Sequence, residues 1–175
     1  MTHKIINNLL THDQEDLLES SVLNENTQWL FNRFTAYKHS AYGVSDELKK
    51  NINSFRHPVF QSNKMIDREM YDLFKLIPEK LGAKNIYNMI CQLQLVTVGE
   101  HKPIKHVDMP MHSSPYATIV YYINDSDGPT VLYEDFEIIR CEHERGKLIV
   151  FDGNIKHHAS RPSKDIRCVM NFCFD

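Results

Sequence analysis

The sequence has no long hydrophobic run. No apolar stretch approaches the roughly 20 residues needed to cross a bilayer. The start, MTHKIINNLLTHDQEDLLES, also lacks the uninterrupted apolar core of a signal peptide. These absences predict a protein without a membrane partner and with a cytoplasmic location.

Cysteine is scarce and its spacing is uninformative. The four cysteines, Cys91, Cys141, Cys168 and Cys173, form no C-x-x-C pair. In a reducing compartment neither a disulfide framework nor a four-cysteine zinc site is expected. We predict four reduced cysteines in the core.

The chain has no excess of basic charge and few residues that make linkers. Its formal net charge is -3 and its sequence pI is about 6.4, so no global positive field attracts nucleic acid. Only 6 glycines and 7 prolines occur in 175 residues, and no Gly- or Pro-rich segment divides the chain. A single domain spanning residues 1–175 follows, as a monomer or weak homodimer.

Hydrophobic periodicity divides this domain into two parts. Residues 1–84 are expected to provide helical support and a first strand at 27–37, at the edge of a sheet. The stripe from Ile66 to Leu81 predicts an amphipathic helix that is capped by Ser62 or Asn63, kinked or restarted at Pro78 and closed by Gly82. The intervening segment 38–65 has no clear pattern and is where a substrate-covering lid is expected.

Residues 85–175 have the sequence pattern of a β domain. Apolar and β-branched runs occur at 85–98, 116–124, 130–139, 147–152 and 167–174, separated by short turn signals such as DSDGP and ERG. A chain in which helices come first and strands follow is expected to form an α+β fold with an antiparallel sandwich or barrel. The jelly roll is one such solution.

Two histidines and an aspartate lie close together in IKHVDMPMH, residues 104–112. Side chains at i and i+2 of an extended segment project to the same side, so His106 and Asp108 could chelate one ion. An H-x-D pair alone is weak evidence. A third ligand is expected from FDGNIKHHASRP, where His157 and His158 compete. Two imidazoles and a carboxylate form the facial triad of non-haem Fe(II) oxygenases, although these ligands alone do not exclude zinc.

Arg167 stands at the head of the apolar strand RCVMNFCF, ten residues after His157. A charge is costly there unless it meets an anion. The anion could be a carboxylate of the protein, or the distal carboxylate of 2-oxoglutarate bound in a bidentate manner.

The order His106-x-Asp108, His157, Arg167 resembles that of the Fe(II)/2-oxoglutarate-dependent dioxygenases, prolyl 4-hydroxylase-like branch. The segments ATIVYYIND, GPT and GKLIVFDGNIKHHA are similar to the corresponding family segments, and IVYYIN, FDGN and RCVMNF are close to those of small phage or bacterial members. The resemblance implies a double-stranded β-helix, a cupin-like jelly roll with supporting N-terminal helices. It implies His157, six residues after Phe151, as the third metal ligand, and Tyr121 beside Arg167 as a ligand of the cosubstrate.

The activity implied by this resemblance is hydroxylation by Fe(II), 2-oxoglutarate and O2, with ascorbate as an optional reductant, releasing succinate and CO2. By the same resemblance the substrate is a prolyl residue of a protein or peptide, with small molecules as an alternative, and a phage-encoded member would act in the host cytoplasm. The second hypothesis is a cupin-like isomerase or a non-catalytic metal-binding module that holds zinc or nickel.

Overall fold

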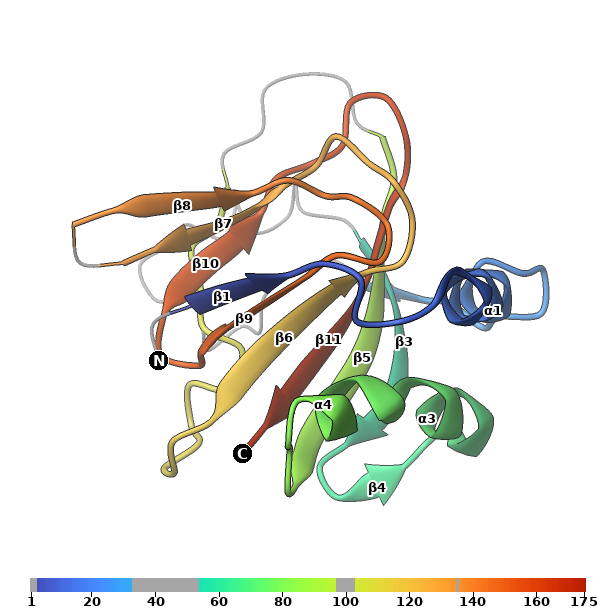
Figure 1. Ribbon diagram of the computed structural model, residues 1–175, viewed down its shortest axis with the longest axis horizontal. Coiled ribbons are helices and arrows are strands. Elements are labelled where there is room, and N and C mark those ends of the chain that lie inside the picture. Colours follow the sequence, from blue (N-terminus) through green and yellow to red (C-terminus); the bar gives the residue numbers. More distant parts are fainter. Residues whose placement is uncertain (1–2, 33–53, 97–102, 135) are drawn as a thin grey trace.

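Two antiparallel β-sheets form the centre of the molecule (Figure 1). The computed structural model describes residues 3–32, 54–96, 103–134 and 136–175. The larger sheet has the order β1-β9-β6-β11-β5-β3-β2, with β4 paired to β3. Its strands are β1 (His3–Ile6), β2 (Leu30–Asn32), β3 (Ser54–Gln61), β4 (Lys64–Met65), β5 (Ile86–Gln94), β6 (Ala117–Tyr122), β9 (Leu148–Asp152) and β11 (Arg167–Phe174).

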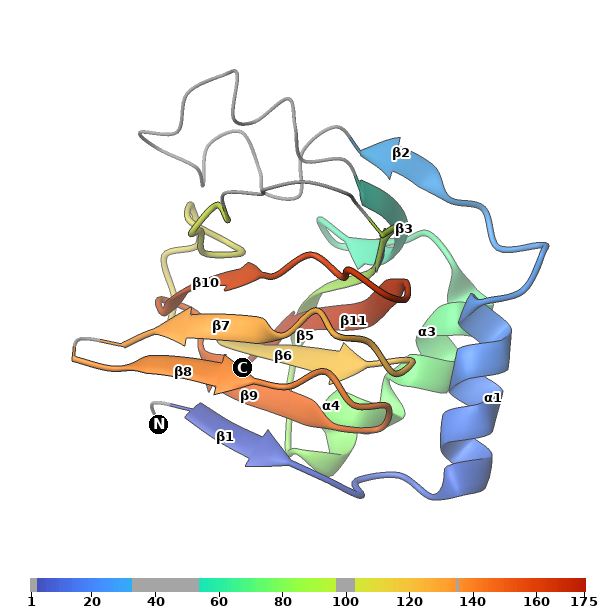
Figure 2. The same ribbon diagram turned by 90° about the horizontal axis from the view of Figure 1, so that it is seen from above.

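The smaller sheet has the order β10-β7-β8 and lies against one face of the larger sheet (Figure 2). Its strands are β7 (Thr130–Tyr133), β8 (Ile138–Cys141) and β10 (Lys156–Ala159). Seven buried side chains from both sheets pack between them: Val120, Tyr122, Leu132, Cys141, Ile149, Phe151 and Val169. The arrangement is a jelly roll, which confirms the predicted fold class.

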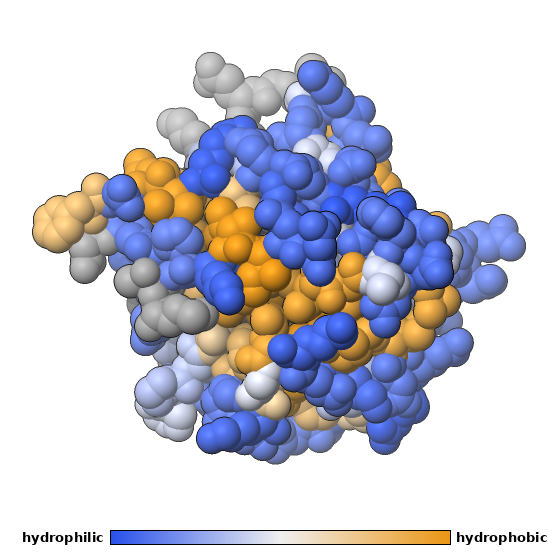
Figure 3. Space-filling view, in the orientation of Figure 1, coloured by the Kyte–Doolittle hydropathy of each residue, from blue (hydrophilic) through white to orange (hydrophobic). Residues whose placement is uncertain are grey.

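Three helices pack against the opposite face of the larger sheet: α1 (His12–Val22), α3 (Arg68–Phe74) and α4 (Leu76–Lys80). A second core cluster lies between them and the strands, with Leu18, Phe74 and Ile77 from the helices. Because the helices gather at one side, they cover this face only in part, and a band of apolar surface crosses the middle of the view in Figure 3. No helix in the described ranges is long and apolar enough to span a membrane.

The predicted helix after residue 65 is shorter than expected and is divided in two. Its N-cap is Asp67, whose side chain accepts a hydrogen bond from the Met70 backbone N–H, whereas Ser62 and Asn63 form the left-handed turn between β3 and β4. The division between α3 and α4 falls at Lys75, because a proline ring clashes with the carbonyl four residues earlier and Pro78 therefore ends α3 at Phe74. Gly82, with a φ of 81°, closes α4 as predicted.

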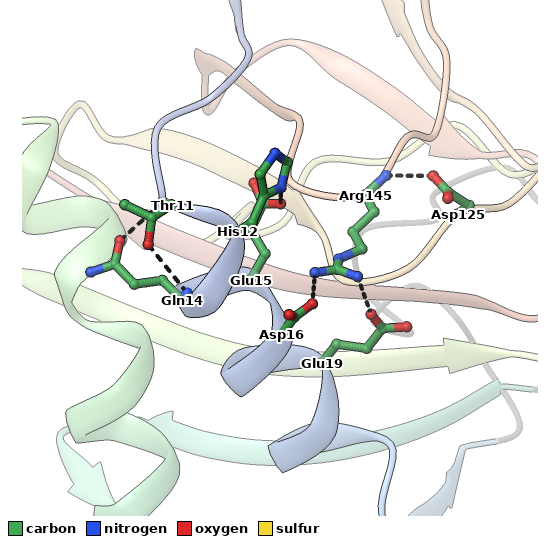
Figure 4. Close-up of polar contacts among 8 residues, drawn as sticks. All are labelled: Thr11, His12, Gln14, Glu15, Asp16, Glu19, Asp125 and Arg145. Carbon is green, nitrogen blue, oxygen red and sulfur yellow. Dashed lines mark hydrogen bonds and ion pairs between the residues drawn. The ribbon is translucent and has the colours of Figure 1, made fainter.

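An ion-pair network fixes α1 against the loop before β9 (Figure 4). The Arg145 guanidinium donates to Asp16, and it also contacts Glu19 Oε2 at 3.1 Å. The Arg145 backbone N–H donates to Asp125 Oδ1 at 2.9 Å. Thr11 and Gln14 begin α1 with a capping box, so the helix is fixed at its start and along its length.

Several predicted elements differ from those in the structure. The run 130–139 contains two strands, β7 and β8, and β1, β3, β4 and β10 lie where no strand was predicted. Residues 1–84 therefore contribute four strands, not one, to the larger sheet. Of the segment 38–65, residues 38–53 lie outside the described ranges, and 54–65 form β3, the turn and β4. The four cysteines are free and buried, as predicted.

Candidate metal centre

His106 and His157 are brought together by a β-bridge between the loop before β6 and strand β10. The His106 N–H donates to His157 O at 3.0 Å, and the His157 N–H donates to His106 O at 2.9 Å. The two ring centroids lie 4.5 Å apart. Asp108 follows two residues later, and one ligand atom from each of the three residues lies within 4.8 Å of the others. The structure thus places the three predicted metal-ligating residues in one cluster.

Backbone carbonyls orient both imidazoles. Nδ1 of His106 lies 3.0 Å from Ile104 O, and Nδ1 of His157 lies 3.1 Å from Ile155 O. Since only a protonated nitrogen can donate to a carbonyl, Nε2 of each ring is left with its lone pair. These Nε2 atoms face Asp108 Oδ1 at 3.8 and 3.6 Å. This is the arrangement in which neutral histidines bind a metal.

Burial and mutual charge set the protonation of the cluster. Burial, together with the charge of His157, lowers the pKa of His106 to about 4. Burial alone would raise the pKa of Asp108, but the neighbouring His157 and His106 outweigh it and hold that pKa below its ordinary value. Burial opposes protonation of His157, yet the Asp108 carboxylate raises its pKa. A carboxylate between two imidazoles is a donor set that fits a divalent transition metal.

His158 does not belong to this cluster. Its Nδ1 lies 3.1 Å from the Tyr133 hydroxyl, and its Nε2 lies 3.4 Å from Ser160 Oγ. Burial, with the nearby His106 and His157, lowers its pKa to about 4. The geometry therefore favours His157 over His158 as the third ligand.

A pocket extends from His106 and His157 into the space between the sheets, and Arg167 lies in its wall. Only 1% of Arg167 is exposed. Its Nε donates to Gly128 O at 2.8 Å and its Nη2 to Thr130 Oγ1 at 3.0 Å. No carboxylate of the described residues forms a salt bridge with it, and burial lowers the pKa of its guanidinium. A buried cation without a counter-ion makes this pocket a site for an anion.

Two further polar side chains in the pocket wall have unsatisfied oxygens. Gln94 Oε1 and Asn171 Oδ1 are buried and have no hydrogen-bond partner within the described ranges. Buried polar atoms are rarely left unpaired, so each is available to a donor from a ligand or a water molecule.

Comparison with solved structures identifies the fold. No family model matches the sequence, and no curated protein matches it. A prolyl hydroxylase from Trichoplax adhaerens, solved with a peptide of hypoxia inducible factor, is similar with a TM-score of 0.68 at 12% identity, over 98% of this chain and 82% of that one. An oxidoreductase of the 2OG-Fe(II) oxygenase family from Burkholderia pseudomallei gives 0.69 at 9% identity, over 99% and 85%. HygX from Streptomyces hygroscopicus, with nickel and 2-oxoglutarate bound, gives 0.61 at 9%, over 98% and 82%.

The chain has the fold of the 2-oxoglutarate and Fe(II) oxygenases. These similarities extend over nearly the whole chain, so the helices and the N-terminal strands belong to the shared architecture as well as the jelly roll.

In this oxygenase fold Tyr121 does not reach the pocket, which corrects the assignment made from the sequence. Tyr121 packs against Phe74 beneath the helices, with ring centroids 6.5 Å apart. Side chains alternate along a strand, and the neighbours of Tyr121 on β6, Val120 and Tyr122, face the smaller sheet. Tyr122 pairs with Val169, which lines the pocket. Its ring stacks on His143 with centroids 4.3 Å apart, and its hydroxyl donates to Cys141 O at 3.4 Å. The Arg167 guanidinium is near enough to oppose the rise that burial causes in the pKa of this hydroxyl. Because β6 is buried on both faces, the sequence carries no signal that separates Tyr121 from Tyr122.

One hydroxyl joins the two loops that carry the candidate ligands. Tyr116 Oη accepts from the Met109 N–H at 2.9 Å and donates to Gly153 O at 2.9 Å. Met109 follows Asp108, and Gly153 begins the loop to His157. The Tyr116 ring lies so close to Gly153 that a Cβ there would be 2.2 Å from ring carbon Cε2.

Substitution of Gly153 by alanine is therefore expected to destabilise the fold. Because the new methyl group collides with a buried ring, the free energy of unfolding should fall by about 1–3 kcal/mol. Urea denaturation followed by circular dichroism measures the change, with Ser113→Ala in the exposed part of the neighbouring loop as the control. An unchanged midpoint for Gly153→Ala would contradict the close contact with Tyr116.

Proposed function

We propose that the protein is an Fe(II)- and 2-oxoglutarate-dependent dioxygenase that hydroxylates its substrate and releases succinate and CO2. One observation carries the proposal: Arg167, a buried cation that pairs with no carboxylate of the described residues, lies in the same pocket as the two histidines of the metal cluster. A dicarboxylate with a 2-oxo group satisfies both ends of such a pocket, because one end can meet the metal and the other the guanidinium.

Each residue has a separate task in this proposal. His106, Asp108 and His157 would hold Fe(II), and the Ile104 and Ile155 carbonyls keep both imidazoles in the metal-binding tautomer. Bound Fe(II), 2-oxoglutarate and O2 together supply the oxidising chemistry. Arg167 would bind the distal carboxylate, and Gly128 O and Thr130 Oγ1 hold its guanidinium in place.

The competing hypothesis, a cupin-like isomerase or binding module with zinc or nickel, assigns no function to Arg167. A site built only for metal has no need of a buried cation, which repels the metal. Metal analysis of the purified protein, together with ligand titration, separates the two hypotheses.

The test is a pair of ligands that differ only at the distal carboxylate. We expect protein loaded with Mn(II), a redox-stable substitute for Fe(II), to bind 2-oxoglutarate at least about 100-fold more tightly than 2-oxopentanoate in calorimetry, because a buried charge pair contributes about 2–5 kcal/mol. Equal affinities would contradict the proposal. Succinate formation with Fe(II), ascorbate and O2 then measures turnover.

The substrate that we propose is a prolyl residue in a protein or peptide. The solved structures that share the fold include prolyl hydroxylases, one of them solved with a peptide, and HygX, also solved with hygromycin B. A small-molecule substrate is the alternative. Mass spectrometry of candidate peptides for a gain of one oxygen atom tests the first.

The two neighbouring tyrosines of β6 provide a matched test of strand register. Tyr122→Phe removes a hydroxyl on the side of the smaller sheet that donates to Cys141 O. If this hydroxyl turns to bound 2-oxoglutarate, its loss should weaken binding about 3- to 10-fold, the effect of one hydrogen bond. Tyr121→Phe removes a hydroxyl from the core under the helices, and the affinity should stay unchanged. If calorimetry instead shows that Tyr121→Phe weakens 2-oxoglutarate binding and Tyr122→Phe does not, Tyr121 is the cosubstrate ligand.

A further inference from the structure

The hairpin of strands β7 and β8 projects from the body of the molecule, at the left in Figures 1 and 2. Strand β8 is the outermost strand of the smaller sheet, and its free edge pairs with no strand in the described part of the chain. A free edge presents backbone N–H and C=O groups to which another strand can bind. Strand β8 can therefore accept one more strand.

The hydrogen bonds of the hairpin decide which residues of β8 face the free edge. Glu134 and Glu137 exchange two backbone hydrogen bonds across the turn: the Glu134 N–H donates to Glu137 O at 3.0 Å, and the Glu137 N–H donates to Glu134 O at 3.4 Å. Residues that are bonded to the neighbouring strand alternate with residues that are not, along any antiparallel strand. The N–H and C=O groups of Ile138 and Arg140 therefore point away from β7, toward the free edge.

The side chains of β8 alternate between the core and the solvent. Ile139 and Cys141 pack into the cluster between the two sheets. Ile138 faces outward and is 69% exposed, and Phe136, in the turn before it, is fully exposed. Proteins usually place charged side chains or proline on a free edge to prevent pairing. Two large apolar side chains at this edge therefore favour a partner.

Two contacts from outside the hairpin hold it in place before any partner binds. His3 of β1 contacts Glu134 at the end of β7, with Nδ1 2.7 Å from Oε1. The Lys105 ammonium lies 3.6 Å from the centroid of the Tyr133 ring. Because the edge is already ordered, an added strand loses less conformational freedom when it binds.

A second copy of the same edge fits these groups. Two β8 strands related by a twofold axis run antiparallel, and residues whose backbone groups point outward must lie opposite one another. With the axis at Ile138, this residue meets the partner subunit's Ile138. Arg140 then lies beside the partner subunit's Phe136, where the guanidinium can stack on the exposed ring. The symmetry repeats this cation–π contact on the other side of the axis.

Other registers of the same pair bring less favourable groups together. With the axis at Arg140, the two guanidinium groups face each other, and like charges directly opposite are destabilising. With the axis at Ile139, Ile138 lies opposite Arg140 and Phe136 lies opposite Glu142, so neither apolar side chain meets another. A shift farther from the turn leaves Phe136 without a partner. The order of charged and apolar side chains therefore selects the register centred on Ile138.

We propose that the protein forms a homodimer in which two β8 strands pair antiparallel about Ile138 and join the two smaller sheets into one. Phe136, Ile138 and Arg140 lie outside the metal cluster and the pocket, so the dimer does not depend on the proposed function. An interface made by one short strand belongs to the small and weak class, and we expect a dissociation constant of about 10–100 µM.

The first test is sedimentation velocity of the full-length protein, over concentrations that bracket this dissociation constant. The sedimentation coefficient should rise with concentration toward that of a dimer. Ile138→Lys places two ammonium groups opposite each other at the axis and should weaken the dimer at least about tenfold. Leu17→Lys, the same kind of change at a 51% exposed position of α1, is the matched control and should dimerise as the wild type does. A monomer at every concentration, or an Ile138→Lys dimer as stable as that of the wild type, would overturn the proposal.

The second test measures the register by disulfide formation. Opposite residues that exchange backbone hydrogen bonds have Cα atoms about 5.5 Å apart, a distance that a disulfide can span. Oxidised glutathione should therefore link two Ile138→Cys chains, taking two electrons and two protons from their thiols, whereas the four native cysteines are buried and should not react. In the matched control Arg140→Cys, the two Cα atoms lie about 13 Å apart along the strands, too far for a disulfide. Equal linkage in both variants would contradict the register, and no linkage of Ile138→Cys would contradict the dimer.

Discussion

Asp108→Ala is expected to abolish tight binding of Mn(II) and Fe(II), and with it succinate formation. Asp108 is the only carboxylate in the cluster, and its Oδ1 faces Nε2 of both histidines. Changes in residues that merely support a ligand weaken metal binding by about 10- to 100-fold, so loss of the carboxylate itself should exceed that range. Isothermal titration with Mn(II) measures the affinity.

Thr118→Val is the matched control for Asp108→Ala. The Thr118 hydroxyl donates to Asp108 Oδ2 at 3.3 Å and touches no other member of the cluster. We expect an intermediate loss within the range given for supporting residues. Metal affinity in Asp108→Ala equal to that of the wild type would rule out the cluster as the metal site.

Arg167→Met is expected to raise the dissociation constant of 2-oxoglutarate at least about 100-fold while Mn(II) binding stays unchanged. The pocket then lacks the cation that would meet the distal carboxylate, and loss of a buried charge partner costs about 2–5 kcal/mol. The affinity for 2-oxopentanoate, which has no distal carboxylate, should change little. Calorimetry with both ligands gives the comparison.

Arg167→Lys separates charge from geometry. Lysine keeps the charge but cannot reproduce the planar fork that contacts Gly128 O and Thr130 Oγ1, so an intermediate affinity is expected. Replacing an unpaired buried charge by an apolar side chain is usually neutral or stabilising, so Arg167→Met should unfold no earlier than the wild type in the absence of ligand. Full 2-oxoglutarate affinity in Arg167→Met would show that the anion binds elsewhere.

Much of the β architecture was predictable because its central strands are continuous apolar and β-branched runs between short turns. The exceptions have local causes. Strand β10, KHHA, has no apolar pattern. Its two histidines are buried because of tertiary contacts, which β-strand propensities do not describe. The run 130–139 was interpreted as one strand because no glycine or proline marks the turn between β7 and β8. Strand β3 contains Pro58, a residue that is rare within strands, and the structure accommodates it with a bulge between Pro58 and Phe60.

The candidate site was predictable in its residues but not in its register. The H-x-D spacing, His157 and Arg167 were identified from the sequence, and the structure brings them to one end of the jelly roll. Tyr121 and Tyr122 are chemically identical neighbours, so only the pairing of β6 with β11 and β9 decides which one faces the smaller sheet. The bridge between His106 and His157 joins a residue of a loop to a strand, a pairing that has no sequence signal.

The Tyr116 hydroxyl links the two loops that supply the candidate metal ligands. It accepts from the Met109 N–H, next to Asp108, and donates to Gly153 O, in the loop that leads to His157. A shift of one loop on metal binding therefore strains the hydrogen bond that holds the other loop. Such coupling is reciprocal: whatever factor the intact Tyr116 bridge adds to the affinity for the metal, metal binding adds to the stability of the bridge.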